Sequence, residues 1–168
     1  MNFAGKEYIF ECAGEDDVEA IFSLYEKRVR WMDEKGIYQW NVTDYLSAYP
    51  ISYYYDCQKN GKLYALKSAE DGTVVGAAVV FDEYERWGDN ASAFYIHNLV
   101  TDIQKKGIGK CLITEIEKLA LRSDKRFVRL DCAEDNEFLN GYYASLGYKE
   151  AGRCEDGPYK GIQREKKL

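Results

Sequence analysis

The N-terminal third of the chain carries apolar residues at two different periods. Apolar and polar residues alternate over 7–12, and this period of two predicts a β-strand. From Asp17 to Lys35 the apolar residues recur every three or four positions, which predicts an amphipathic helix that ends at Gly36. A second, shorter helix is expected to begin at Thr43 or Asp44 and to end at Pro50.

Three strands and a helix are expected in the middle of the chain. The segments 62–67 and 74–81 flank the turn residues Glu70-Asp71-Gly72, so they are predicted to form a hairpin. A charged loop then leads to a largely apolar strand at 93–100. A helix is predicted to follow at roughly 108–122.

The last third of the chain repeats the alternation of strand and helix. It comprises a strand at 126–132, a helix at 136–146 and a final hairpin of 148–154 and 159–165. The order of elements along the chain is therefore β-α-α-β-β-β-α-β-α-β-β. This order predicts an α/β fold in a single domain over residues 1–168, without a linker or a repeat.

Composition and charge narrow the classes of function. The 168 residues are 46% hydrophobic and 31% charged, which is typical of a globular chain. The net charge of −6 argues against nucleic acid as a partner. The longest apolar run, 74–81, is too short to span a bilayer, so no membrane partner is expected. No charged-then-apolar leader opens the sequence, and we expect a cytoplasmic protein.

Cysteine and histidine are placed in a way that argues against a metal site. The five cysteines are widely spaced and contain no Cys-x-x-Cys, a pattern typical of free thiols in a reducing cytoplasm. His97 is the single histidine of the chain. Because zinc sites in proteins use paired cysteines and histidines, we expect no metal here.

The most informative stretch is the basic glycine loop at 104–110, which joins the strand at 93–100 to the next helix. Backbone N–H groups at a helix N-terminus favour an anion, and two glycines let the backbone approach a phosphate. A P-loop would require serine or threonine at Cys111, and a dinucleotide fingerprint would require glycine at Leu112. The loop is therefore either a different pyrophosphate site or a tight turn with solvated lysines.

Two motifs resemble those of the GNAT superfamily of N-acetyltransferases. The pattern Gln-x-x-Gly-x-Gly at 104–109 resembles the loop with which the family binds the pyrophosphate of coenzyme A. Asn136 and the segment 143–148, Tyr-x-x-x-Gly-Tyr, look like the family's second conserved segment. The predicted order of elements is also similar to the GNAT fold. The resemblance implies an α/β domain whose mixed central sheet has about six to seven strands, with helices on both faces.

The resemblance further implies acetyl-CoA as the acyl donor. The residues expected to bind it are Gln104, Lys105, Lys106, Gly107, Ile108, Gly109 and Lys110 of the loop, Leu99 and Val100 of the preceding strand, and Asn136. In relatives a backbone N–H of that strand stabilises the oxyanion, and the asparagine contacts the pantetheine arm. Tyr143 is the expected general acid for the leaving thiolate. The connection from Val100 to Gln104 is one or two residues shorter than is typical of the family, which leaves the position of the oxyanion donor open.

Several of these residues have a structural role as an alternative. Tyr143 is either the acid or a core aromatic residue. Asn136 also suits a helix N-cap, and the two roles are compatible because a cap uses one side-chain atom. Gln104 either contacts phosphate or closes the turn. The three lysines are either phosphate contacts or solvated charges beside a main chain that binds the anion.

His97 is the candidate general base. In some relatives a glutamate near this point of the strand helps to deprotonate the amine, and a free imidazole has a pKa of about 6.5. The alternative is a histidine whose role is to pack within the sheet. Asp82, Glu83 and Glu85 of the preceding loop are competing bases or solvated charges.

The resemblance places the acceptor wall in the first two helices and their connection, where aromatic residues are abundant. Trp31, Tyr38 and Trp40 are the candidate substrate residues, and acids such as Asp33 and Glu34 suit a cationic amine. The alternative is that most of these rings pack the helices onto the sheet.

Together these features predict an acetyl-CoA-dependent N-acetyltransferase that moves an acetyl group directly to a primary amine of a small molecule or peptide. Two alternatives stay open. One is a non-catalytic acyl-CoA-binding module that regulates or docks a partner, and the other is a nucleotide-binding protein. The resemblance also implies that the chain can form a homodimer, since relatives commonly do.

Overall fold

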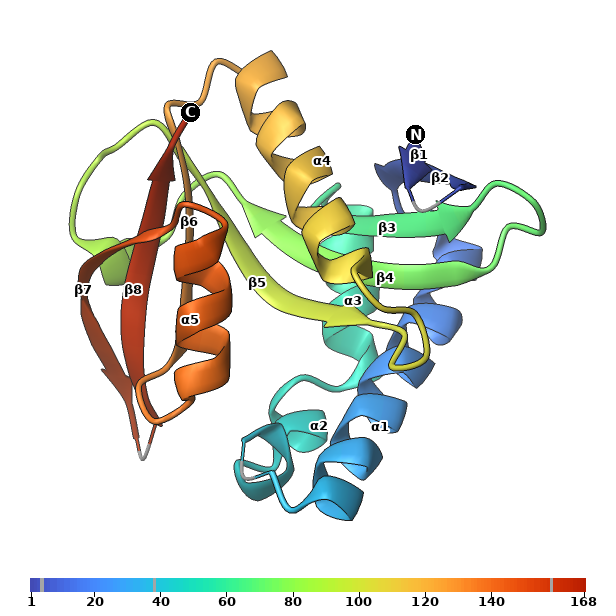
Figure 1. Cartoon of the computed structure of the whole chain (residues 1–168), viewed down its shortest axis with the longest axis horizontal. Coiled ribbons are helices and arrows are strands. Elements are labelled where there is room, and N and C mark those ends of the chain that lie inside the picture. Colours follow the sequence, from blue (N-terminus) through green and yellow to red (C-terminus); the bar gives the residue numbers. More distant parts are fainter. Residues whose placement is uncertain (4, 38, 158) are drawn as a thin grey trace. The chain divides into compact units, whose positions relative to one another are not determined.

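The computed structural model describes residues 1–3, 5–37, 39–157 and 159–168 (Figure 1). These residues divide into two compact units. The first unit comprises Met1–Val80 and Asn98–Ile113, and the second comprises Phe81–His97 and Thr114–Leu168. Strand β5 (Ala93–Thr101) and helix α4 (Ile108–Arg122) each begin in one unit and end in the other.

The strands form a mixed sheet of eight in the order β1-β2-β3-β4-β5-β6-β8-β7. The remaining strands are β1 (Asn2–Phe3), β2 (Lys6–Cys12), β3 (Leu63–Ser68), β4 (Val74–Phe81), β6 (Phe127–Ala133), β7 (Lys149–Asp156) and β8 (Tyr159–Lys167). Strand β5 pairs with β6 in parallel, whereas the β2–β3, β3–β4 and β7–β8 pairs are antiparallel. The predicted α/β fold with a mixed sheet is confirmed. The predicted six to seven strands omitted β1, which is too short to show a period.

Three α-helices follow β2 in the first unit, one more than the sequence predicts. They are α1 (Val18–Lys35), α2 (Tyr45–Ala48) and α3 (Ile51–Lys59). Helix α1 ends as predicted, because Gly36 adopts the left-handed conformation (φ 64°) and donates its N–H to the carbonyl of Asp33. Helix α3 was missed because Pro50 predicts an end. In the structure Pro50 directly precedes α3, where its fixed φ and missing N–H are favourable.

The core of the first unit is built around β4 and the helices α1 and α3. Residues Val74–Val80 of β4 are buried without interruption, as expected of a strand that is covered on both faces. Helices α1 and α3 pack through the fully buried rings of Tyr25 and Tyr54, whose centroids are 4.6 Å apart. At Gly76 of β4, a Cβ atom would lie 3.3 Å from the carbonyl oxygen of Val100. The last residues of β5 therefore pack directly against the β4 backbone.

In the second unit, α5 (Glu137–Ser145) packs on β6 (Figure 1). Arg129 of β6 is 5% exposed and binds both carboxylate oxygens of Asp89, at 2.6 and 2.9 Å. It also pairs with Glu165 and lies 4.3 Å from the ring centroid of Trp87. Because a buried guanidinium needs such partners, Arg129 holds the segment that contains Trp87 and Asp89 against the sheet.

The five cysteines are free thiols. Cys57, Cys111, Cys132 and Cys154 are buried, and Cys12 is exposed. Burial raises the pKa of the Cys57 and Cys132 thiols, and it raises the pKa of Cys154 to about 11. These buried thiols are therefore protonated at neutral pH, which makes them weak nucleophiles.

Gly76→Val is expected to destabilise the protein by about 1–3 kcal/mol, because its side chain would overpack the space beside Val100 and Ile108. Urea unfolding monitored by circular dichroism measures the change. Gly141→Ala in α5 is the control, since no atom beyond its chain neighbours and its own helix backbone lies within 4 Å of the added methyl group. That control should be stabilised by about 0.5–1 kcal/mol, and equal stability of the two variants would contradict the packing described here.

Candidate functional site

The glycine loop of the first unit has the backbone geometry of an anion site. Gly107 lies in the left-handed region (φ 81°) and directly precedes α4. The N–H of Cys111 donates to the carbonyl of Gly107, as in the first turn of a helix. The N–H groups of Ile108, Gly109 and Lys110 precede this bond and have no acceptor within the helix. They carry the partial positive charge that favours a phosphate.

The turn before Gly107 is organised by Asp102. Its carboxylate accepts the backbone N–H of Gln104 at 2.9 Å, and its carbonyl oxygen accepts the N–H of Lys105 at 3.2 Å. The Gln104 main chain therefore closes the turn, while its side chain is exposed. Lys106 and Lys110 are also exposed, and Lys105 is half-buried.

Gly107 and Ile108 also have packing roles. A Cβ atom on Gly107 would lie 2.7 Å from Cζ of Phe3, so the ring of Phe3 occupies the space beside this glycine. The Ile108 side chain is buried, at 1% exposed, and faces Gly76 of β4. Because this side chain is buried, Ile108 can contact an anion only through its backbone N–H.

The strand residues Leu99 and Val100 follow an irregular point in β5. Asn98 has a φ of 50°, which is rare for a residue other than glycine. Its carbonyl oxygen accepts a hydrogen bond from the Tyr25 hydroxyl, and its side chain bonds the hydroxyls of Tyr45 and Tyr53. The sequence prediction did not single out Asn98. An asparagine within an otherwise apolar strand was the available signal, because asparagine is depleted in strands and tolerates positive φ.

Most aromatic side chains predicted near the acceptor form a packed cluster. It comprises the rings of Tyr25, Trp40, Tyr45, Tyr49, Tyr53 and Tyr54. Trp40 is half-buried and stacks on Tyr45 with centroids 4.4 Å apart. Trp31 is half-buried, and the Arg28 guanidinium carbon lies 5.1 Å from the centroid of its ring. Tyr38 lies outside the described residues.

In the second unit, Asn136 and Tyr143 are both positioned by α5. Asn136 is the N-cap of this helix, and its Oδ1 accepts the N–H of Leu139 at 2.9 Å. Asn140 fixes the first turn, because its Nδ2 donates to the carbonyls of Ala133 and Asn136, each at 2.9 Å. The cap leaves the Nδ2 group of Asn136 for another acceptor.

Tyr143 is a buried tyrosine whose hydroxyl bonds no group among the described residues. Its side chain is 8% exposed, and its ring packs edge-on against Tyr142 and Tyr148. Tyr148, by contrast, donates its hydroxyl to Glu117 at 3.0 Å. Burial, together with the nearby Cys132 and Asp131, raises the pKa of Tyr143 well above its ordinary value. The phenol therefore holds its proton throughout the neutral range.

His97 packs among aromatic rings in the second unit. Its imidazole meets Tyr84 edge-on at 4.2 Å and Phe81 at 5.1 Å between centroids. Burial is the main cause that lowers the pKa of His97 to about 4; Asp131 opposes this shift, and Arg86 contributes to it. The imidazole is therefore neutral at pH 7, so it can accept a proton but is a weak base.

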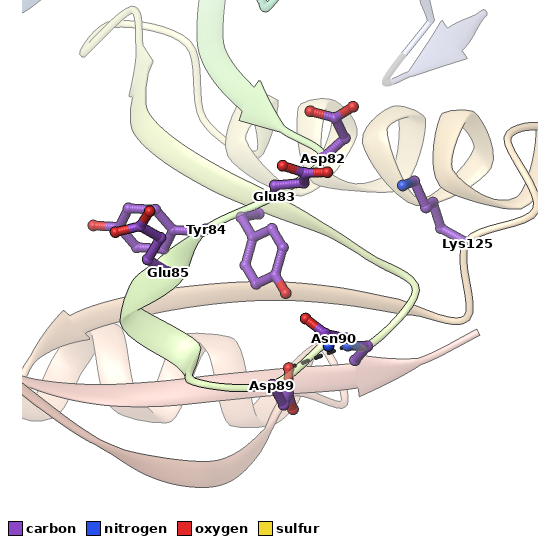
Figure 2. A pocket seen from close by; sticks show the side chains of 9 residues that line it. Asp82, Glu83, Tyr84, Glu85, Asp89, Asn90 and Lys125 are labelled. Carbon is purple, nitrogen blue, oxygen red and sulfur yellow. Dashed lines mark hydrogen bonds between the residues drawn. The ribbon is translucent and has the colours of Figure 1, made fainter.

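The acids that compete with His97 line a pocket of about 410 Å³ in the second unit (Figure 2). Figure 2 shows that Asp82, Glu83 and Glu85 come from the segment after β4 and that Lys125 comes from the turn before β6. Tyr84 lines this pocket and also contacts His97. The pocket is thus bounded by charges of both signs and by the ring that covers the histidine.

The part of the chain that the structure describes holds neither a metal-binding cluster nor a membrane-spanning helix. No cluster of three or more histidine, cysteine, aspartate or glutamate side chains there could hold a metal ion. No helix among those residues is long and apolar enough to cross a bilayer.

The motifs and the fold agree with a known family of proteins. The family model for the acetyltransferase (GNAT) family matches residues 30–148. This chain belongs to the GNAT family. It is also 26% identical over 149 residues to the uncharacterised N-acetyltransferase YesJ of Bacillus subtilis. The aligned residues make up 84% of this chain and 82% of YesJ. The chain is accordingly a GNAT N-acetyltransferase, from a family that uses acetyl-CoA.

Solved structures of GNAT proteins share the whole fold. A GNAT-family acetyltransferase from Listeria monocytogenes has 26% identity and a TM-score of 0.84, with 100% of this chain and 99% of that chain covered. The PaiA N-acetyltransferase of Thermoplasma acidophilum, solved in complex with coenzyme A, has 17% identity and a TM-score of 0.75. The match covers 96% of this chain and 99% of the PaiA chain. At 17% identity the likeness shows the fold alone.

The low pKa of His97 predicts a pH-dependent stability. In the unfolded chain an imidazole has a pKa of about 6.5, so between that value and about 4 the unfolded state binds the extra proton. Stability is therefore lost as the pH falls through this window. From pH 7.5 to 5 this loss is about 2 kcal/mol in the free energy of unfolding.

Urea titrations of the wild type and of His97→Gln at both pH values measure this contribution. The carboxylates contribute equally to both proteins, and the chain has no other histidine. The variant should consequently lose about 2 kcal/mol less than the wild type on acidification. Parallel losses in the two proteins would show that the pKa of His97 is not lowered.

Proposed function

We propose that this GNAT enzyme transfers the acetyl group of acetyl-CoA directly to a primary amine of a small molecule or peptide. The observation that carries the proposal is Tyr143, a tyrosine that is 8% exposed, whose hydroxyl has no hydrogen-bond partner among the described residues. Among the described residues no buried side-chain oxygen or nitrogen lacks a partner, so the Tyr143 hydroxyl is the part of this side chain that stays accessible, where it can meet a ligand atom. The position of Tyr143 in the Tyr-x-x-x-Gly-Tyr segment supports the same role.

The glycine loop is the proposed site for the pyrophosphate of the donor. The N–H groups of Ile108, Gly109 and Lys110 supply backbone donors, and the left-handed Gly107 shapes the turn that presents them. Gln104, Lys105 and Lys106 directly precede Gly107 in the loop and are proposed to be part of the same site. The two lysines add positive potential for the pyrophosphate. The free Nδ2 group of Asn136 is the proposed donor to a carbonyl of the pantetheine arm.

Acetyl-CoA supplies an acetyl thioester, whose carbonyl carbon forms a C–N bond with the amine as its C–S bond breaks. A backbone N–H of Leu99 or Val100 is the proposed donor to the oxyanion that develops on the carbonyl oxygen. Tyr143 gives its proton to the departing thiolate. His97 takes the proton released by the amine nitrogen, and that proton finally replaces the one lost by Tyr143. The products are the acetylated amine and coenzyme A.

The acceptor is proposed to be a cationic amine that loses its charge on binding. Trp40 has a half-buried ring whose accessible part can meet an ammonium group, and the net charge of −6 attracts cations. Trp31 is less available for such a contact, because Arg28 already lies over its ring. Tyr38 completes the predicted set.

Tyr143→Phe is expected to lower kcat by about 10²–10³-fold, because it removes the proton that the thiolate receives. The Kd for acetyl-CoA should change less than about twofold, since the ring stays in place. Tyr142→Phe, which removes the neighbouring hydroxyl, is the matched control and should keep kcat. Steady-state kinetics with isothermal titration of acetyl-CoA separate the two effects, and a wild-type kcat in Tyr143→Phe would rule out the acid role.

Release of coenzyme A with a panel of amines tests the proposed function itself. The panel should contain a polyamine, an aminoglycoside, free amino acids and a peptide with a free N-terminus. Turnover with at least one of them is expected. Binding of acetyl-CoA without turnover on any amine would instead favour a non-catalytic acyl-CoA-binding module. Thermal stabilisation by ATP but not by coenzyme A would favour a nucleotide-binding protein.

The pKa of His97 also predicts the shape of the pH profile. Because His97 is neutral above about pH 4, kcat/KM for the amine should follow the fraction of neutral amine. For an amine with a pKa near 10 this means a rise of about tenfold per pH unit from pH 6 to 8. An inflection near pH 6.5 that disappears in His97→Gln would contradict the lowered pKa.

A further inference from the structure

The end of β5 is fixed by side chains from the helices of the first unit. Asn98 holds a left-handed backbone conformation (φ 50°), which is unfavourable for a residue with a side chain and persists only where surrounding contacts determine it. Here the contacts come from three tyrosines. Tyr25 lies on α1, Tyr45 on α2 and Tyr53 on α3.

Each tyrosine bonds a different atom of Asn98. Tyr25 donates to the main-chain oxygen, and Tyr53 donates to Oδ1 at 3.1 Å. The Nδ2 group donates to the Tyr45 hydroxyl at 2.6 Å. The Tyr45 hydroxyl in turn bonds that of Tyr54 at 3.2 Å, deep in the core. The conformation of Asn98 is thus determined by a network that is anchored in three helices.

Thr101 anchors the same strand three residues later. Nη2 of Arg28 donates to its carbonyl oxygen at 2.8 Å and contacts its Oγ1 at 3.3 Å. Leu99 and Val100 therefore lie between two residues that side chains of the helices hold in place. Since a preorganised donor must be fixed before the reaction begins, this anchoring bears on catalysis.

We propose that Asn98 is a positioning residue, which the hydroxyls of Tyr25, Tyr45 and Tyr53 hold so that the N–H groups of Leu99 and Val100 point to the thioester carbonyl. The inference rests on the proposed function. It adds that the aromatic cluster at the expected acceptor wall also sets the geometry of the oxyanion donor. The rings that pack around Trp40 are then coupled to the acetyl group through Asn98.

A double-mutant cycle tests this coupling. Asn98→Gly keeps access to positive φ but removes both side-chain bonds, and Tyr53→Phe removes one hydroxyl with the ring retained. Each is expected to lower kcat on the order of tenfold, with the Kd for acetyl-CoA within about twofold of the wild type. In the Asn98→Gly background, Tyr53→Phe should have no further effect on kcat, because its partner is gone.

Tyr55→Phe is the matched control, because Tyr55 lies on the same helix and its hydroxyl makes no hydrogen bond among the described residues. It should keep the wild-type kcat. Assays run well below the Tm of every variant separate positioning from stability. Variants with a lowered Tm but a wild-type kcat would overturn the proposal, as would independent effects of Tyr53→Phe in both backgrounds.

A second readout does not require turnover. In protein labelled with ¹⁵N-leucine and ¹⁵N-valine, acetyl-CoA should shift the amide signals of Leu99 or Val100 in the wild type, and this shift should shrink in Asn98→Gly. An equal shift in both proteins would overturn the positioning role even if no amine is acetylated. If no amine is turned over but the wild type and Asn98→Gly still differ in this shift, the proposed function is refuted and the positioning role of Asn98 stands.

Discussion

Buried hydroxyl groups must find hydrogen-bond partners, and in the first unit this requirement determines how helices α1 to α3 meet strand β5. The chain has 15 tyrosines, and three of the buried ones, Tyr25, Tyr45 and Tyr54, form one network. A well-paired strand would offer these hydroxyls few free acceptors, because its carbonyls bond the neighbouring strands. The irregular backbone at Asn98 offers a carbonyl and an amide instead. Helix packing and the irregular strand therefore stabilise each other.

The sequence could predict the elements whose periods are long and regular. Helix α1, the hairpin of β3 and β4 and the C-terminal hairpin follow from apolar spacing and turn residues alone. Strand β1 and helix α3 could not be found in this way. Two residues show no period, and a proline reads equally as the end of one helix or the beginning of the next.

The candidate site was predictable in part. The glycine loop and Asn136 follow from local rules, because a turn and an N-cap depend on neighbours in sequence. Tyr143 and Tyr148 are the same residue type five positions apart, and sequence patterns cannot say which hydroxyl has a partner. Glu117, which binds Tyr148, lies 31 residues away. The lowered pKa of His97 likewise depends on rings and charges that meet it only after folding.

The burial of the cysteines has a practical chemical consequence. Coenzyme A carries an accessible thiol, whereas four of the five protein thiols are buried, and Cys12 is the exposed one. Burial and the adjacent Glu11 raise the pKa of Cys12, which slows its reaction as well. A colorimetric thiol reagent added to the folded enzyme should therefore report released coenzyme A against a background of about one slow equivalent per chain. The same reagent would count five equivalents once the chain is denatured.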